Sequence, residues 1–439
     1  MATEQSDAPE LQRHLGLVSL TLYGVGVIIG AGIYVLVGKI AGAAGPGAWL
    51  AFLAAAVAAL PTGLSYAELA SRYPQSAGEA VFVDRAFGRP ALSFVVGYLV
   101  LASGVASTAA VAHGFASYSI DLVGAGASMH TPIVVAFLVA LSLLNHRGIE
   151  EATWFNVLCT LVSVGSLVVI VIAGAGSWGS VDVTTLTSAD GSSGGTMALV
   201  AGAALAFYAY IGFEDVCNVA EEVIDPVKTI PRAILIAMAV TTALYILVGI
   251  TAVSVVPAAE LAASEVPLSL VSERVLPSLP PGWLNLVALL ATANTALFNL
   301  IMSSRILYGL GRQGLIPKGF ARVHPKRKTP SWGVVVAFVL AAVFALSGVL
   351  EVLAKATNTI ILLAFFSVNA SLIGIRLRGV ADDASADHFT VPLIVPVIGL
   401  VATVYMVVQF DADAYLRAGA LVLSGAVLYV AQAVVARRR

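Results

Sequence analysis

Long uninterrupted runs of apolar residues recur along this chain, and they decide what it can fold into. Of the 439 residues, 59% are hydrophobic and only 11% are charged, against about 25% charged in an average soluble domain. A chain with so little polar surface cannot cover itself in water, whereas runs of about 20 apolar residues are long enough to cross a bilayer as helices. The sequence therefore predicts an all-α polytopic membrane protein surrounded by a lipid bilayer.

Twelve apolar runs can be placed, which predicts twelve transmembrane helices. They lie at 16–38, 47–70, 90–119, 131–146, 153–174, 196–222, 232–256, 281–310, 331–350, 357–376, 390–409 and 414–436. The linkers are short, and the longest polar ones lie at 71–89, 175–195, 257–280 and 311–330.

The basic residues support this count. If the N-terminus is cytoplasmic, 19 of the 23 Lys and Arg residues fall on the inner side, and the other four are Lys39, Arg274, Lys355 and Arg417. Cytoplasmic loops of multi-pass proteins carry such an excess, and an error of one span would scramble the alternation of basic and non-basic loops. We expect a multi-pass protein of the cell membrane with both termini cytoplasmic.

Two of the twelve runs are interrupted by glycine. Gly30-Ala31-Gly32 interrupts the first, and the sixth contains Gly212 followed by Glu214 and Asp215. A charge at membrane depth costs about 2.5–3.5 kcal/mol, so such a residue suggests a functional site, and a glycine beside it is where a helix can unwind. Two interrupted spans in one polytopic chain indicate a transporter with its binding site near the bilayer midplane.

The interrupted runs are the first and the sixth, five spans apart. This spacing predicts two five-helix repeats, the second inverted relative to the first, with discontinuous helices 1 and 6. We divide the chain into a cytoplasmic N-terminal tail, a first repeat, a second inverted repeat and two additional C-terminal transmembrane helices, at 1–15, 16–174, 196–376 and 390–436.

The first interruption has the character of an anion site. An opened helix at Gly30-Ala31-Gly32 would expose amide groups beside a half-helix N-terminus, which carries about half a positive charge and suits a carboxylate. The alternative is close helix packing through the small residues Gly26 and Gly30.

The second interruption has the character of a cation site. Unwinding around Ile211 and Gly212 would free carbonyl groups at the negative end of a half-helix, which suits an ammonium group. Tyr208 and Tyr210 are candidate aromatic gates, although a tyrosine in a span is more often a packed core residue. A carboxylate at one break and an ammonium at the other describe an amino acid, while other small polar solutes also fit.

We expect no catalytic residues, no metal and no organic cofactor. The net charge of −2 argues against a nucleic-acid partner. Cys159 and Cys217 lie in apolar runs without metal-type spacing. The stretch 191–195 fits G-x-S-x-G but lies in a Gly/Ser-rich loop without the strand and helix of a nucleophile elbow. A sensor would need an appended soluble domain, and no segment is long enough for one.

These residues resemble the amino acid–polyamine–organocation superfamily, nearest to cationic-amino-acid-transporter-like and general prokaryotic permeases. The resemblance covers nearly the whole chain and implies the same twelve-span fold with a 5+5 inverted repeat. It rests on Gly30-Ala31-Gly32-Ile33-Tyr34, Tyr66-Ala67-Glu68-Leu69, Asn145 with Gly148, the stretch from Phe207 through Glu221-Glu222, Asp225-Pro226, Ile230-Pro231-Arg232, Ser304-Arg305, Gly314-Leu315-Ile316-Pro317, His324-Pro325, Thr329-Pro330 and Val368-Asn369.

The resemblance also implies roles for residues at the two breaks. The backbone of Ala31 and Gly32 would bind the substrate carboxylate, and its ammonium would be bound by the carbonyl groups of Ile28, Tyr208 and Ile211. Tyr208 matches a gating aromatic residue. Glu214 matches a glutamate that relatives use as a proton-sensitive switch.

One position departs from the pattern. Many relatives have a lysine, the proposed proton carrier, where this chain has Ser163. A serine hydroxyl is a candidate ligand for Na⁺ together with carbonyls of the first span, or it has no ionic role, which would leave an exchanger or facilitator. H⁺ and Na⁺ both stay open as coupling ions.

Our leading interpretation is a secondary active transporter that moves an amino acid by alternating access. The resemblance implies that spans 1, 2, 6 and 7 rock against spans 3, 4, 5, 8, 9 and 10. The substrate side chain and the oligomeric state stay open.

Overall fold

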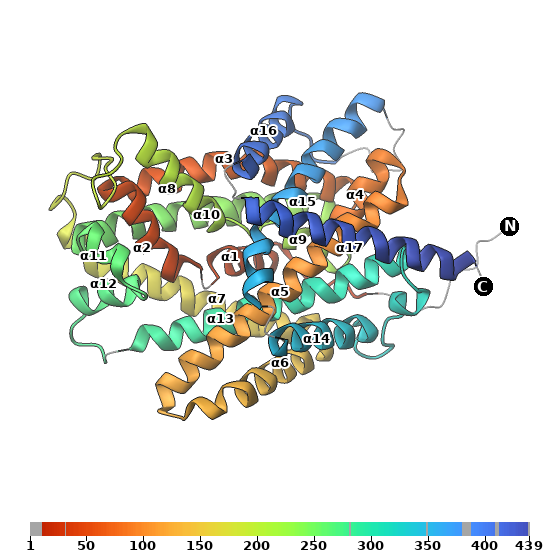
Figure 1. The fold of residues 1–439 in the computed structure, drawn as a ribbon, viewed down its shortest axis with the longest axis horizontal. Coiled ribbons are helices and arrows are strands. Elements are labelled where there is room, and N and C mark those ends of the chain that lie inside the picture. The colour runs from red at the N-terminus through yellow and green to blue at the C-terminus, as the bar shows by residue number, and fades with distance from the viewer. Residues whose placement is uncertain are drawn as a thin grey trace.

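The structure is a computed structural model that describes residues 11–30, 32–280, 282–347, 350–379, 388–408 and 412–437. These residues form an elongated bundle of α-helices that run mostly along its length (Figure 1). The described residues contain no β-strand, and only two isolated β-bridges occur among them. This agrees with the all-α prediction.

The helices follow the apolar runs closely, and α4, α9, α11 and α12 are the shortest of them. Their bounds are α1 Leu17–Ile29, α2 Gly32–Ala44, α3 Ala48–Arg72, α4 Gly78–Phe87, α5 Pro90–Val123, α6 His130–Arg147, α7 Ile149–Gly174, α8 Thr196–Tyr208, α9 Asp215–Asn218, α10 Pro226–Val255, α11 Ala258–Ala263, α12 Pro267–Val275, α13 Trp283–Arg312, α14 Ser331–Leu346, α15 Leu350–Arg378, α16 Ile394–Val408 and α17 Ala412–Arg437.

Eight helical stretches of the described chain are long and apolar enough to cross a membrane. One of them, Gly32–Arg72, runs through α2 and α3. Four shorter apolar helices accompany them: Leu17–Ile29, Thr196–Tyr208, Ser331–Leu346 and Ile394–Val408. Each of the twelve predicted runs thus contains helix, while the number of membrane crossings stays a prediction.

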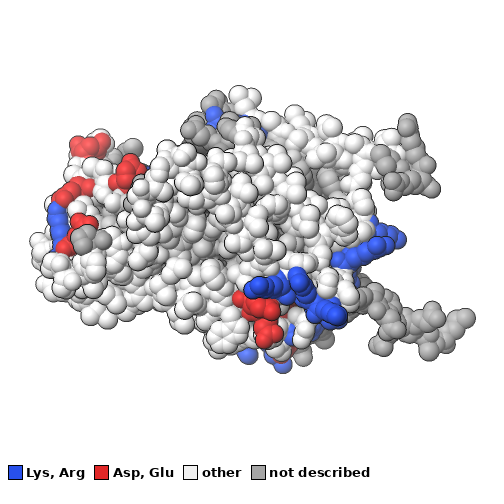
Figure 2. All heavy atoms as spheres, turned by 90° about the horizontal axis from the view of Figure 1, so that it is seen from below, with Lys and Arg blue, Asp and Glu red and all other residues white. Residues whose placement is uncertain are grey.

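The surface has the pattern that a bilayer requires. Large apolar side chains point outward in the middle of several helices, such as Val57, Leu161 and Leu423, which are 64%, 54% and 67% exposed. Figure 2 shows the charged side chains gathered towards the two ends of the molecule, with an almost uncharged belt between them on this face. An apolar belt of this extent is not found on soluble monomers, so the chain is a multi-pass membrane protein.

Two of the predicted polar linkers contain helices. Gly78–Phe87 forms α4, whose residues are mostly buried, and the linker 257–280 contains α11 and α12. The helix α4 ends at Phe87, and the next residue, Gly88, adopts the left-handed conformation with φ +61° that closes a helix. Polarity correctly located these segments between spans, but it did not reveal that α4 packs against α5 and α15.

The short helix α1 lies at the centre of the bundle, where it packs against α7, α10 and α13 (Figure 1). The segment before it is tied to the segment after α9. The N–H groups of His14 and Leu15 donate to the Glu222 carbonyl at 2.8 and 2.9 Å, and the Ile224 N–H donates to the Leu15 carbonyl at 2.9 Å. The chain ahead of α1 and the chain behind α9 are therefore held side by side by the backbone.

Candidate functional site

The first break lies between α1 and α2. Helix α1 ends at Ile29, and Gly30 follows with φ +42° and ψ −153°, a conformation that residues with a side chain rarely adopt. The Gly30 N–H still donates to the Gly26 carbonyl at 3.1 Å. Helix α2 begins at Gly32, and Ala31, which the sequence predicts as a carboxylate ligand, lies outside the described residues.

The second break is longer. Helix α8 ends at Tyr208, residues 209–214 form turns, and the short helix α9 begins at Asp215. Gly212 has φ +129°, and its N–H donates to Oε2 of Glu214 at 2.8 Å. The break therefore uses the conformational freedom of a glycine and carries a carboxylate that satisfies one of its own amide groups.

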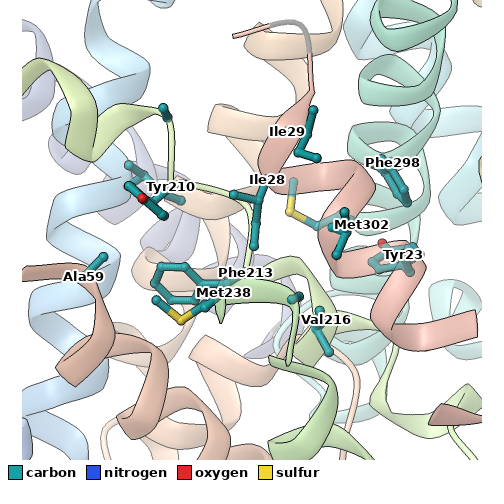
Figure 3. Packing of buried hydrophobic residues seen from close by; sticks show 14 of the residues in the cluster. Tyr23, Ile28, Ile29, Ala59, Tyr210, Phe213, Val216, Met238, Phe298 and Met302 are labelled. Carbon is teal, nitrogen blue, oxygen red and sulfur yellow. The ribbon is translucent and has the colours of Figure 1, made fainter. Parts of the chain in front are cut away.

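The second break lies against the last turn of α1, directly before the first break. A Cβ atom added to Gly212 would lie 2.6 Å from Cγ1 of Val27 and 3.2 Å from the backbone nitrogen of Ile28. In Figure 3 Ile28 stands at the end of α1, with Tyr210 on one side and Met302 on the other. The two interrupted runs, far apart in the sequence, thus come together in the fold.

Tyr245 on α10 connects the two breaks. Its hydroxyl is buried and lies 2.9 Å from the carbonyl oxygen of Ile28 and 3.0 Å from that of Ala209. One hydroxyl proton is thus available to two carbonyl groups, one from each break. Sequence reasoning missed Tyr245, because a tyrosine in an apolar span has no local signal that distinguishes it from a packed core residue.

A cavity of about 120 Å³ adjoins the second break. Its wall includes the predicted residues Ile211, Gly212 and Glu214. The other lining residues come from α1, α5, α9, α13 and α15. They are Val27, Val100, Ser103, Gly104, Ser107, Asp215, Thr295, Asn299, Met302, Thr357 and Ile361. A short hydrogen-bonded pair lies in this wall, since the Asn299 side chain donates to the Ser107 hydroxyl at 3.0 Å.

The predicted gating tyrosines do not line this cavity. Tyr210 is fully buried, its hydroxyl donates to the Phe52 carbonyl at 3.1 Å, and its ring packs on Tyr245 with centroids 5.4 Å apart. Tyr208 is half-buried at the end of α8. Tyr210 thus has the contacts of a core residue, and the gating role of both tyrosines stays a prediction.

Ser163 also lies apart from the cavity wall. It is buried on α7, and its carbonyl accepts the Tyr34 hydroxyl at 3.4 Å. One turn away on the same helix, Thr160 joins a buried amide cluster with Asn156 and Asn294, in which the Asn156 amide donates to the Asn294 carbonyl oxygen at 3.2 Å. Asn294 on α13 therefore bonds the neighbouring helix α7.

Buried carboxylates divide into paired and unpaired groups. Arg305 holds Glu222 through two hydrogen bonds of 3.0 and 3.1 Å, and both side chains are fully buried. Glu214 and Asp215 at the second break are only 2% and 5% exposed, yet no described Lys or Arg forms an ion pair with either. The site therefore contains buried acid groups without a compensating cation.

Comparisons with known proteins agree with this architecture. Residues 15–422 match the amino acid permease family. The chain is 31% identical to the branched-chain amino acid permease BcaP of Bacillus subtilis, over 85% of this chain and 83% of that protein. It is 30% identical to the methylthioribose transporter of the same organism, over 91% and 88%, and 30% identical to the inner membrane transport protein YbaT of Escherichia coli, over 83% and 84%.

The match spans both helix breaks, the cavity wall and the buried ion pairs, and it confirms the resemblance drawn from the sequence motifs. The chain belongs to the amino acid permease family of membrane transport proteins.

Proposed function

We propose that this protein is a secondary transporter that moves an amino acid across the cell membrane by alternating access. The observation that carries the proposal is that Gly212, in the break from Tyr208 to Asp215, contacts the last turn of α1 just before the break at Gly30, beside a cavity whose wall includes Glu214. Unwound backbone inside a membrane is tolerated where it lines a cavity and binds a solute. Family membership is consistent with this.

In this proposal α1 with α2 and α8 with α9 are the two discontinuous helices of a twelve-span fold. At 1.5 Å per residue a helix of 13 residues, such as α1 or α8, covers only about 20 Å of a hydrocarbon core of about 30 Å. Each therefore needs its second half to complete a crossing. The repeats are 16–174 and 196–376, with 390–436 outside them and both termini in the cytoplasm.

The substrate carboxylate would bind the amide groups of Gly30, Ala31 and Gly32, and its ammonium would bind the carbonyls of Ile28, Tyr208 and Ile211. The Ile28 carbonyl accepts the Tyr245 hydroxyl in this structure. A carbonyl oxygen has two lone pairs, so an ammonium group can share this oxygen or take the place of the hydroxyl. Relatives named for branched-chain and for cationic amino acids make both classes candidate substrates.

The test is uptake into proteoliposomes of a panel of radiolabelled amino acids that includes leucine, isoleucine, arginine and lysine. We expect saturable uptake or exchange of at least one member, and its loss in Gly212→Ala, since the added Cβ would strain a backbone with φ +129° and press on Val27. A matched control is Gly165→Ala on α7, where a Cβ meets no other atom within 4 Å. The absence of uptake, exchange and binding for every amino acid would contradict the proposal.

For coupling we propose H⁺ with Glu214 as the titrating group, and Na⁺ at Ser163 or uncoupled exchange are the alternatives. A buried carboxylate without a cation is poised to bind a proton. Glu214→Gln is expected to remove the pH dependence of transport while substrate binding remains. If Na⁺ is the coupling ion, transport by wild type should depend on Na⁺ and Ser163→Ala should weaken that dependence. If the protein is an exchanger, uptake should require substrate inside the proteoliposomes, which counterflow with and without internal substrate measures.

A further inference from the structure

A third buried carboxylate lies close to Glu214 and Asp215, on the short helix α4 that connects α3 and α5. Glu79 is 1% exposed, and its Oε1 accepts long hydrogen bonds of 3.4 Å from the Tyr66 hydroxyl and from the Asn218 side-chain amide. The side-chain oxygen of Asn218 is buried and has no hydrogen-bond partner in the structure. A polar group that lacks a partner thus adjoins the buried acid.

The groups that face Glu79 are acids or neutral. Tyr66, Cys217, Glu214 and Asp215 interact with it electrostatically.

The cations of neighbouring helices are engaged elsewhere. Arg305, Arg312 and Arg376 pair with Glu222, Glu221 and Glu68; Arg378 donates to the Ala86 carbonyl; Arg72 and Arg85 lie over the Tyr73 ring. Within the described residues, no ion pair neutralises any of the three carboxylates.

Three buried carboxyl groups in electrostatic contact cannot all carry a charge, because each charge raises the cost of the next. Glu79 lies outside the predicted spans, and burial raises the pKa of its carboxyl group to about 7. A metal would be the other way to compensate the charges, but no group of three or more His, Cys, Asp or Glu side chains in the described residues is arranged to hold one. The cluster therefore fits protons as its ligands.

We propose that Glu79 is a proton-binding residue of the transport cycle, and that it shares one proton with Glu214. This inference rests on the proposed function. In the transfer, a proton leaves the Glu214 carboxyl group and binds the Glu79 carboxylate, which accepts hydrogen bonds from the Tyr66 hydroxyl and the Asn218 amide. The products are a Glu214 carboxylate and a protonated Glu79, so the net change is one proton moved from the cavity wall to α4.

The first experiment measures accumulation driven by a proton gradient and counterflow at equal pH, both in proteoliposomes. The proteins are wild type, Glu79→Gln and the control Glu265→Gln, whose side chain is exposed and lies outside the cluster. The probe is a radiolabelled mixture of the standard L-amino acids. One coupled proton and a gradient of one pH unit support about a tenfold accumulation. We expect this accumulation in wild type and in Glu265→Gln, and its loss in Glu79→Gln, while counterflow at equal pH persists in all three.

Tyr66→Phe keeps the ring and removes the hydroxyl that donates to Glu79. Like Glu79→Gln, this variant should lose gradient-driven accumulation and keep counterflow. The inference is overturned if Glu79→Gln accumulates substrate like wild type, if it loses both activities in parallel, or if wild type does not respond to a proton gradient. A wild-type protein that neither takes up nor exchanges any amino acid contradicts the proposed function instead.

A second measurement needs no transport. Infrared titration of the purified protein should show a protonated carboxyl band that disappears near pH 7 in wild type and in Glu265→Gln, and that is missing in Glu79→Gln. An unchanged band in Glu79→Gln means that another group binds this proton, and it overturns the assignment to Glu79.

Discussion

Glu222, which pairs with Arg305, and the two acids Glu79 and Glu214 are all buried, but they differ in their hydrogen-bond partners. Glu222 accepts two hydrogen bonds from Arg305, whose guanidinium also donates to Asn145 at 2.7 Å and to Ser304 at 2.9 Å. Glu79 and Glu214 have only neutral donors, the Tyr66 hydroxyl and Asn218 amide for one and the Gly212 N–H for the other. Glu222 stays ionised because it is paired with Arg305, whereas Glu79 and Glu214 can change their charge by binding protons.

Buried acids thus have two roles in this helical bundle, a structural role with an arginine partner and a proton-binding role with neutral partners. A buried acid with an arginine holds elements together, because loss of either partner leaves an uncompensated charge. A buried acid with neutral partners can release a proton at moderate pH, since burial disfavours its ionised form. The predictions below test this division, from the largest expected effect to the smallest.

Arg305→Met should cause the largest loss of stability, about 3–5 kcal/mol, because it leaves Glu222 buried without its cation. Thermal denaturation in detergent would measure the loss. The double variant Arg305→Met with Glu222→Met is the matched control, and it should recover most of the stability because both charges are then gone. Equal destabilisation in the single and double variants would mean that packing, and not charge, accounts for the effect.

Glu79→Gln should change how stability depends on pH. The folded protein raises the pKa of Glu79 from 4.5 to about 7, so folding favours the protonated form. The stability that this form contributes is present below pH 4.5 and is lost as the pH rises through 7. That shift corresponds to at most about 3 kcal/mol.

The measurement for Glu79 is thermal denaturation at pH 5 and pH 8. Wild type should lose stability between the two, and Glu79→Gln should lose less, so that the variant becomes the more stable protein at pH 8. The same loss in both proteins would show that Glu79 does not titrate in this range.

Tyr245→Phe tests a buried contact that involves no charge. It removes the donor shared by the Ile28 and Ala209 carbonyls, and a loss of about 1–2 kcal/mol is expected for buried groups left without a partner. Because the two breaks lose their link, substrate affinity should also fall. Tyr405→Phe, at a 45% exposed position on α16, is the control, and a similar small effect in both variants would argue against a special role for Tyr245.

Arg274→Gln should have the smallest effect, less than about 1 kcal/mol, because its ion pair with Glu260 is well exposed and screened by water. The effect should disappear at high salt. A loss comparable to that of Arg305→Met would show that burial does not decide the value of an ion pair in this protein.

The glycines at the two interruptions could be identified from the sequence, whereas the residues packed around them could not. Gly30 and Gly212 stand out in apolar runs because only glycine readily adopts the backbone that the structure gives them. Glu214 stands out because a charge in a span is costly. Each signal is local, so one sequence suffices to find it.

Other features depend on contacts between distant segments. Tyr245 bonds residues 217 and 36 positions away, and Asn299 meets Ser107 across 192 positions; the rotation of each helix decides such pairs, and hydrophobic runs without a polar stripe do not fix that rotation. Glu79 was missed because its segment is polar, and polarity alone does not show that a helix between spans is packed into the bundle.

The backbone ties at Glu222 have a mechanical consequence. The Glu222 carbonyl binds the segment before α1 and its carboxylate binds α13, so α1 and α9 are anchored at the same residue. A movement that separates these two segments would have to break the main-chain hydrogen bonds of Glu222, and a movement that separates α9 from α13 would have to break its ion pair with Arg305.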